Sequence, residues 1–247
     1  KKTFEQLSSD YQNALSISKD IEEKDFRSLI ETDYFEELDR YIIKSMVKEL
    51  LANTLTRKEV KNFIRSRRKT HWFPNYEHVY ECILYGSEFI HETSTISLGM
   101  DGFEDALNVY TKTWFKVDQL YRKFIFHLKK SSQITLLGDV GELVENKYGN
   151  DYLLRLNDAW QKQLDPLTNW KSESITSQRD FYKTYVQNLR SKGTKCVVII
   201  SDALRYEIGE ELQKRICERD RFEATIDPLL SSLPSYTQLG MASLLPY

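Results

Sequence analysis

The spacing of apolar residues changes along the chain, and this change limits the folds that are open to it. From residue 1 to about residue 190, apolar side chains recur at helical intervals. The clearest run is Phe103, Leu107, Tyr110, Trp114, Val117, Tyr121, Phe124 and Leu128. From Lys195 the pattern differs, because Cys196–Ile200 is a short, continuous and mostly β-branched segment, typical of a strand buried in a parallel sheet. The sequence therefore predicts a helical region followed by an α/β region.

The same helical period predicts further helices before residue 190. They cover Phe4–Leu15, Phe35–Leu50, Tyr76–Leu84, Val140–Val144, Leu153–Leu164 and Phe181–Leu189. Asp101 is placed to cap the helix that contains Phe103, and Thr56 with Glu59 has the spacing of a capping box. No sequence signature recurs at a fixed period of about 34 to 47 residues, so we expect an irregular helical bundle rather than a repeat array.

The carboxyl-terminal region reads as one βαβ unit. After the predicted strand Cys196–Ile200, the segment Leu204–Ile216 has helical spacing and Phe222–Ile226 alternates as a second strand does. We therefore predict a helical domain over residues 1–193 and the start of an α/β domain over residues 194–247. The chain begins without Met and stops within an apolar segment, so we expect it to be a fragment of a longer protein.

Composition excludes several classes of protein. Its 35 basic and 37 acidic residues give a net charge of −2, so no global field attracts nucleic acid or an anionic membrane. The 3 cysteines are odd in number and widely spaced, which argues against a disulfide framework and a zinc finger and favours the cytoplasm. The chain has neither an apolar signal region nor 18 consecutive apolar residues, so we expect no membrane association.

Two polar residues stand where an α/β fold collects functional groups. Asp202 directly follows the first predicted strand, at the edge of the sheet where such folds bind ligands and metals. Thr237 precedes an apolar helical run that includes Leu239 and Leu245. Each residue has a simpler role open to it, since Asp202 is also placed to cap the helix near Leu204 and Thr237 to cap its own helix.

The segments that carry these two residues resemble a known family. Val198–Glu207, with the sequence VIISDALRYE, and Leu233–Pro246, with the sequence LPSYTQLGMASLLP, are similar to the start of a PglZ domain. PglZ domains belong to the alkaline phosphatase superfamily, and this version is most similar to the form in BREX bacteriophage-defence systems. The resemblance covers about residues 195–247 and implies an alkaline-phosphatase-like α/β fold there. We expect residues before it to be the helical region of longer PglZ proteins.

The resemblance also implies roles for the two residues. Asp202 corresponds to a ligand of a divalent metal pair, zinc by preference, and Thr237 corresponds to the nucleophile that bridges the metals. Two divalent cations lower the pKa of a bridging hydroxyl and stabilise charge on phosphoryl oxygens. Further ligands lie downstream in the superfamily, so we expect this fragment to be inactive and to bind no metal. The 4 histidines, His71, His78, His91 and His127, are spaced in a way that predicts no shared metal.

A basic segment is the remaining candidate site. It consists of Lys58, Lys61, Arg65, Arg67, Arg68 and Lys69, with Trp72 and Phe73 beside it. Basic side chains with a neighbouring Trp bind phosphate backbones and stack on bases. A solvated helix face explains the same residues. We expect at most weak, salt-sensitive binding of nucleic acid.

Two functions remain open at this level. The first is the helical region and initial βαβ unit of a metal-dependent phosphatase or phosphodiesterase of a phage-defence system, with other defence proteins as partners. The alternative is a helical module that docks partners in a multi-protein defence complex, with a phosphatase-like domain of structural role.

Overall fold

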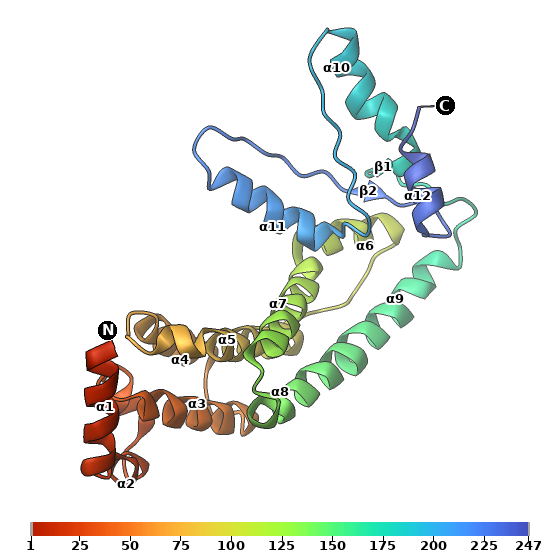
Figure 1. Ribbon diagram of the computed structural model, residues 1–247. Coiled ribbons are helices and arrows are strands. Elements are labelled where there is room, and N and C mark those ends of the chain that lie inside the picture. The colour runs from red at the N-terminus through yellow and green to blue at the C-terminus, as the bar shows by residue number, and fades with distance from the viewer. Residues whose placement is uncertain (1, 247) are drawn as a thin grey trace. The chain divides into compact units, whose positions relative to one another are not determined.

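The computed structural model describes residues 2–246, and its internal contacts divide the chain into two compact units. Unit 1 consists of residues 1–97 and 117–155, and unit 2 of residues 98–116 and 156–247. Two long helical stretches, residues 103–131 and 134–164, each contain a π-helical segment and contribute to both units. Figure 1 shows the order of the elements along the chain.

The regular elements of unit 1, among the residues that the structure describes, are all helices. Its elements are α1 (Lys2–Ala14), α2 (Ile17–Glu22), the 3-10 helix η1 (Phe26–Leu29), α3 (Glu36–Leu51), α4 (Arg57–Arg67), α5 (Phe73–Thr95), most of α7 (Phe115–Ser131), α8 (Ile134–Asn146) and the π-helical η3 (Lys147–Leu154). The predicted helices of this region are confirmed. So is the capping box, in which Thr56 Oγ1 accepts from the Glu59 amide at 3.2 Å and Glu59 Oε2 accepts from the Thr56 amide at 2.9 Å.

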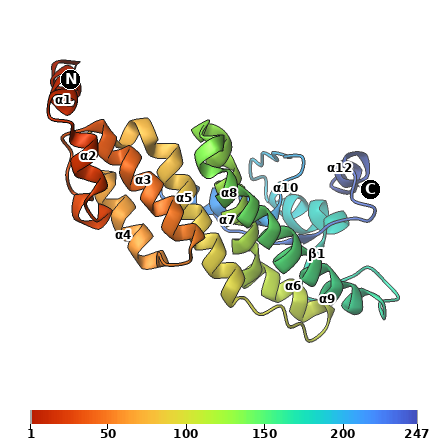
Figure 2. The same ribbon diagram turned by 90° about the horizontal axis from the view of Figure 1, so that it is seen from below.

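The core of unit 1 forms where α3, α4 and α5 lie side by side, as Figure 2 shows. Helical spacing places one apolar stripe of each helix on the same side, and burial of these stripes is the main source of stability. The fully or nearly fully buried apolar side chains include Ile42, Met46, Val60, Ile64, Tyr80, Ile83 and Phe89. Gly86 lets Phe124 approach α5, since a Cβ there would lie 3.2 Å from the ring.

A buried ion pair crosses this core. Arg67 is 0% exposed and donates to Asp39 through Nε and Nη2, at 3.1 and 2.5 Å. Its Nη1 donates to the carbonyls of Thr32 and Ile30, at 2.7 and 3.2 Å, and Tyr80 donates to Asp39 at 2.5 Å. Burial raises the pKa of Asp39 and of Tyr80. The network ties α4 to α3, α5 and the segment before α3.

Unit 2 contains shorter elements. They are α6 (Phe103–Val109), the π-helical η2 (Tyr110–Trp114), α9 (Arg155–Leu164), β1 (Thr176–Ser177), the 3-10 helix η4 (Gln178–Asp180), the π-helical η5 (Tyr182–Gln187), α10 (Asn188–Ser191), α11 (Tyr206–Cys217), β2 (Leu229–Leu230) and α12 (Thr237–Ser243). The prediction that Asp101 caps the first of these helices is wrong. Gly102 occupies the N-cap position at φ 103°, a conformation that glycine adopts without strain.

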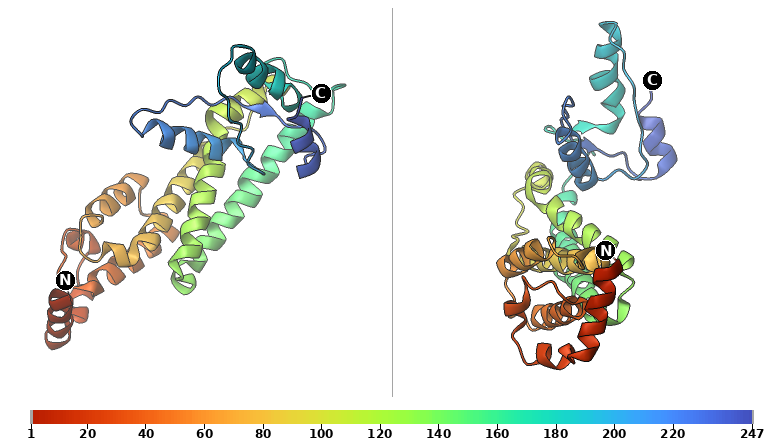
Figure 3. Two further views of the ribbon diagram at one scale, coloured as in Figure 1. Left: turned by 45° about the horizontal axis from the view of Figure 1, so that its top comes forward. Right: turned by 60° about the vertical axis from the view of Figure 1, so that its left-hand side comes forward.

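The two strands pair in parallel, with Thr176 opposite Leu229 and Ser177 opposite Leu230. From β1 the chain passes through η4, η5, α10 and α11 and then returns along an extended segment to β2 and α12, which Figure 3 shows in teal and blue. The predicted fold class is therefore confirmed: a mainly helical chain ends in a small α/β segment with parallel strands. The domain boundary between residues 193 and 194 stays a prediction.

The predicted positions of the strands are wrong. Cys196–Ile200 and Phe222–Ile226 form no ladder, and the parallel pair lies at β1 and β2 instead. Val197 and Ile199 are 76% and 89% exposed, whereas a central parallel strand is buried on both faces. The physical reason is the lack of neighbours: within residues 2–246 no strand lies beside these segments to pair with their backbone groups.

Candidate active site

Asp202 lies in a tight turn between the extended segment that ends at Ile200 and helix α11. Ala203, the next residue, has φ 53°, in the left-handed region that few non-glycine residues adopt. Asp202 does not cap α11, because Arg205 is the N-cap residue and no side-chain cap hydrogen bond is present. The capping role that the sequence left open for Asp202 is therefore not observed.

Thr237 is the first residue of α12. It does not occupy the N-cap position, which belongs to Tyr236, and the helix has no side-chain cap hydrogen bond. Instead the Thr237 hydroxyl points to Asp202, with Oγ1 at 3.4 Å from Oδ1 and 3.3 Å from Oδ2. The two residues thus lie close together, although neither of the predicted strands is formed.

Asp202 and Thr237 line one cavity of about 710 Å³. Serines and glutamines supply most of its other polar groups, and Arg205 is the basic residue among the lining residues. The remaining polar lining residues include Gln178, Ser201, Ser231, Ser232, Ser235 and Gln238. The cavity thus combines a carboxylate, a hydroxyl close to it, and a guanidinium.

Gln178 holds the element that carries Thr237. Its Nε2 donates to the Gly240 carbonyl in α12 at 3.0 Å, and its Oε1 accepts from the Ser232 amide at 3.1 Å. Trp170 donates from its indole to the Ser231 carbonyl at 2.7 Å, just after β2. In Figure 1, β1, β2 and α12 lie together at this place. Hydrogen bonds from the Gln178 and Trp170 side chains and the short β1–β2 ladder therefore fix the segment between β2 and α12.

A metal requires more ligands than these two residues supply. Among the residues that the structure describes, no group of three or more His, Cys, Asp or Glu side chains is arranged to hold a metal ion. The donor types do fit, because carboxylate and hydroxyl oxygens are hard ligands that divalent cations accept. The two oxygens therefore match part of one coordination sphere.

Three residues of the predicted basic and aromatic segment are buried and so are not available to nucleic acid. Arg67 is wrong as a nucleic-acid contact, because its guanidinium is fully buried against Asp39. Trp72 and Phe73 are also buried, at 6% and 8% exposure, so neither offers a free face for stacking on a base. The physical reason is that α4 and α5 turn these side chains into the core.

The rest of that segment lies at the surface and is partly paired. Lys61 Nζ lies 2.8 Å from Glu88, and Arg68 Nη2 lies 2.5 Å from Glu81. Lys58, Arg65 and Lys69 are exposed. Five basic residues, Lys58, Lys61, Arg65, Arg68 and Lys69, thus stay candidates for weak contact with nucleic acid.

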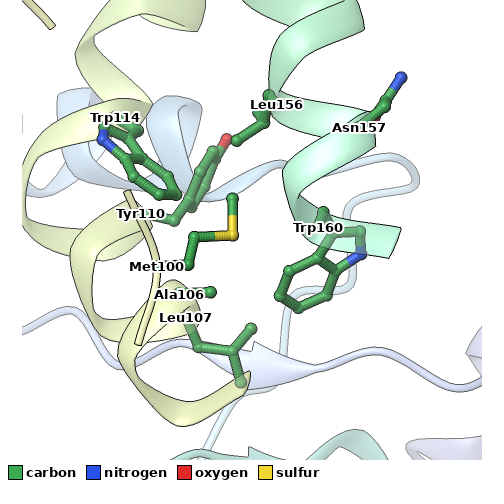
Figure 4. Close-up of a pocket in the computed structure, with 8 residues that line it drawn as sticks. All are labelled: Met100, Ala106, Leu107, Tyr110, Trp114, Leu156, Asn157 and Trp160. Atoms are coloured by element: carbon green, nitrogen blue, oxygen red, sulfur yellow. The ribbon is translucent and has the colours of Figure 1, made fainter. Parts of the chain in front are cut away.

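Two features were not expected from the sequence. His78 and His127, 49 positions apart, face each other with 3.0 Å between their Nδ1 atoms, and burial lowers the pKa of His127. An aromatic pocket of about 190 Å³ lies between α6, η2 and α9, lined by Tyr110, Trp114 and Trp160 among others (Figure 4). Neither feature has a local sequence signal, because each depends on which helices pack together.

Comparison with known proteins shows which family the carboxyl-terminal residues resemble. Residues 181–247 match the model of the BREX system PglZ alkaline phosphatase-like domain. The chain is 29% identical over 249 residues to the alkaline phosphatase-like protein PglZ of Bacillus cereus (strain H3081.97), covering 99% of this chain and 29% of that protein. It is 32% identical over 229 residues to the alkaline phosphatase-like protein BrxZ of Escherichia coli O9:H4 (strain HS), covering 85% of this chain and 26% of that protein.

The chain thus spans 29% and 26% of the length of these two relatives, and no solved structure matches it significantly. The alignments cover 99% and 85% of this chain, so they include much of the helical region before residue 195. That region is therefore also similar to these relatives. Residues 181–247 are therefore similar to BREX system PglZ alkaline phosphatase-like domains, and the predicted resemblance over residues 195–247 is confirmed.

Proposed function

We propose that Asp202 and Thr237 form part of the active site of a metal-dependent phosphatase or phosphodiesterase of a BREX defence system. The observation that carries the proposal is the position of the Thr237 hydroxyl, 3.4 and 3.3 Å from the two Asp202 carboxylate oxygens. Neither residue caps a helix, so capping does not explain this arrangement. The match to alkaline phosphatase-like domains supports the proposed reaction class.

The separation of the oxygens suits a shared cation. Oxygen ligands lie about 2.0–2.2 Å from zinc, and at a tetrahedral angle two such oxygens are about 3.3–3.6 Å apart. Asp202 would hold the metal through its carboxylate. Thr237 would present its hydroxyl as the nucleophile toward phosphorus. A divalent pair would supply charge stabilisation at the phosphoryl oxygens and acidify the hydroxyl.

The remaining parts of the proposal concern the longer protein. By the superfamily pattern, the other metal ligands come from a part of the protein beyond this chain, and we expect the 247-residue chain alone to be inactive. We also propose the domain boundary at residues 193–194, a cytoplasmic setting, and other BREX proteins as partners. Within residues 2–246, no helix is both long and apolar enough to cross a membrane.

The experiment that tests the proposal uses a protein extended to the length of the relatives. We expect it to cleave a bis-aryl phosphodiester, to lose that activity on exhaustive chelation, and to regain it when zinc or manganese is added. Full cleavage that persists after chelation, with residual metal shown to be absent, would refute the metal-dependent site.

A second function has one observation in its favour. The apolar face of α1 is exposed, with Phe4, Leu7 and Tyr11 between 39% and 58% accessible, and Leu15 directly after the helix is 58% accessible. Exposed apolar stripes of this kind are typical of surfaces that bind partners. A helical docking module with a structural phosphatase-like domain would need this face and not Thr237. Replacing Leu7 and Tyr11 with Ser would then weaken assembly of the defence complex, whereas Thr237→Ala would leave the complex intact.

A further inference from the structure

We propose that Arg205 binds an anionic oxygen of the substrate's phosphoryl group beside Asp202 and Thr237. This inference rests on the function proposed above and adds a specificity-determining residue to that site. The position of Arg205, its buried partner and the charges of the cavity support this role.

Arg205 lines the same cavity of about 710 Å³ as Asp202 and Thr237. Its side chain is 55% exposed, so the guanidinium is accessible to a ligand. Among the lining residues, Asp202 is the acidic residue and Arg205 the basic one. A phosphate ester that approaches Thr237 meets the negative charge of Asp202, and a cation in the same cavity offsets that repulsion.

Glu207 fixes the direction of the guanidinium. Arg205 Nη2 donates to Glu207 Oε1 at 3.1 Å, and the Glu207 side chain is 0% exposed. Glu207 lies in the first turn of α11, where the positive end of the helix dipole favours a carboxylate. The carboxylate therefore has a reason for its place that is independent of Arg205, and it anchors one side of the guanidinium.

The chemistry of the guanidinium suits a phosphoryl group. Arg carries five N–H donors in a planar fork, so the bond to Glu207 leaves donors for a second anion. Two parallel N–H groups match two oxygens of a phosphate, which a lysine ammonium does not reproduce. The ligand class is thus a phosphate monoester or diester, held by its non-bridging oxygens.

Arg205 could instead serve only as the counterion of the buried Glu207. That role predicts that inorganic phosphate leaves Arg205 unaffected. Arg215 in α11 provides a matched control, because it pairs with Glu211 at 2.6 Å and its side chain is 72% exposed. Arg215 does not line the cavity.

The first test titrates the 247-residue chain with inorganic phosphate and follows the arginine Nε–Hε signals by NMR. We expect a saturable shift of the Arg205 signal, absent in Arg205→Gln and unchanged in Arg215→Gln. Arg205→Lys, which keeps the charge that neutralises Glu207, is the second variant should Arg205→Gln unfold, and we expect it to bind phosphate more weakly. A titration in which the Arg205 signal does not move would overturn the proposal.

The second test measures turnover in the protein extended to the length of the relatives. We expect Arg205→Gln to raise KM or lower kcat/KM by roughly 10- to 100-fold, the loss typical of a charge-assisted hydrogen bond. Arg215→Gln should match the wild type. Equal kcat/KM for Arg205→Gln and Arg215→Gln in an active enzyme would refute the role of Arg205 and leave the proposed function standing. An inactive wild type would count against the proposed function, while the phosphate titration still decides Arg205.

Discussion

Thr237 directs its hydroxyl to both carboxylate oxygens of Asp202, across 3.4 and 3.3 Å, although 35 positions separate the two residues. These distances are longer than a normal O–H···O hydrogen bond of about 2.7–2.8 Å. The hydroxyl lies almost equally far from both oxygens, at separations that suit two oxygen ligands of one cation. This pair is the part of the molecule on which the functional proposal depends.

Gln178→Leu is expected to loosen α12. The substitution removes the hydrogen bonds to Gly240 and Ser232, and two lost bonds at a partly buried site cost about 1–3 kcal/mol. Hydrogen exchange of residues 231–244 in the 247-residue chain should become faster. Gln161→Leu is the control, because the Gln161 side chain in α9 donates to the exposed Asp165 directly after that helix. Equal exchange in both variants would show that Gln178 does not position Thr237.

Arg67→Met is expected to destabilise unit 1 strongly. The substitution leaves Asp39 buried without its cation, and breaking a buried pair from one side costs about 3–5 kcal/mol. Chemical denaturation followed by circular dichroism measures the change. The exposed neighbour Arg65→Met should stay within about 0.5 kcal/mol of the wild type. A small effect of Arg67→Met would mean that the pair contributes little to the fold.

The capping box makes a pH-dependent contribution to stability. Hydrogen bonds from the Thr56 hydroxyl and amide hold the pKa of Glu59 below its ordinary value. A carboxyl with a lowered pKa in the folded state stabilises the fold above its unfolded pKa, and this contribution disappears as the pH falls through the folded value. Glu59→Gln should therefore lower the Tm at pH 7, and the effect should be smaller at pH 3.

Thr56→Ala should lower the free energy of unfolding by about 1 kcal/mol at pH 7, the usual value for loss of a Thr N-cap.

Glu31→Gln, at an exposed position outside the regular helices, is the control for the Glu59 variant. A Glu59→Gln effect that is the same at pH 7 and pH 3 would contradict the assignment of the pH dependence to this carboxylate.

The basic segment should bind nucleic acid only weakly. Five exposed or half-exposed basic residues neutralise few phosphates, and Lys61 and Arg68 already pair with Glu88 and Glu81. Fluorescence anisotropy with a short duplex should give a Kd weaker than about 1 µM at physiological salt that weakens further as salt rises. Replacing Lys58 and Lys69 with Ala should reduce what binding there is. Tight binding that persists at high salt would contradict this expectation.

Local rules predicted much of the fold. The helical period located α3, α5, α9 and α11, and the Thr56–Glu59 spacing located the start of α4. The strands were misplaced because a strand is defined by its neighbours as well as by its composition. Val197–Ile200 has the composition of a buried strand, yet no strand within the described residues pairs with it.

The sequence predicted the two central residues of the candidate site and did not predict the residues that hold them in place. Sequence motifs identified Asp202 and Thr237. The structure identified Gln178 through its hydrogen bond to α12 and Arg205 through the shared cavity. Arg67 shows the opposite error. It counts as one more charge in a basic run, but helical spacing places it on the buried side with Val60 and Ile64. Composition alone does not distinguish a solvated arginine from one paired in a core.

The most direct test of the central claim is phosphodiesterase activity of Thr237→Ala and Asp202→Asn in a protein extended to the length of the relatives. With a divalent cation present, both variants should lose about 100-fold or more in kcat/KM, since a nucleophile and a metal ligand act on the transition state. Thr225→Ala and Asp220→Asn, exposed residues of the same types outside the cavity, should keep wild-type activity. Folded Thr237→Ala and Asp202→Asn proteins with wild-type kcat/KM would contradict the account.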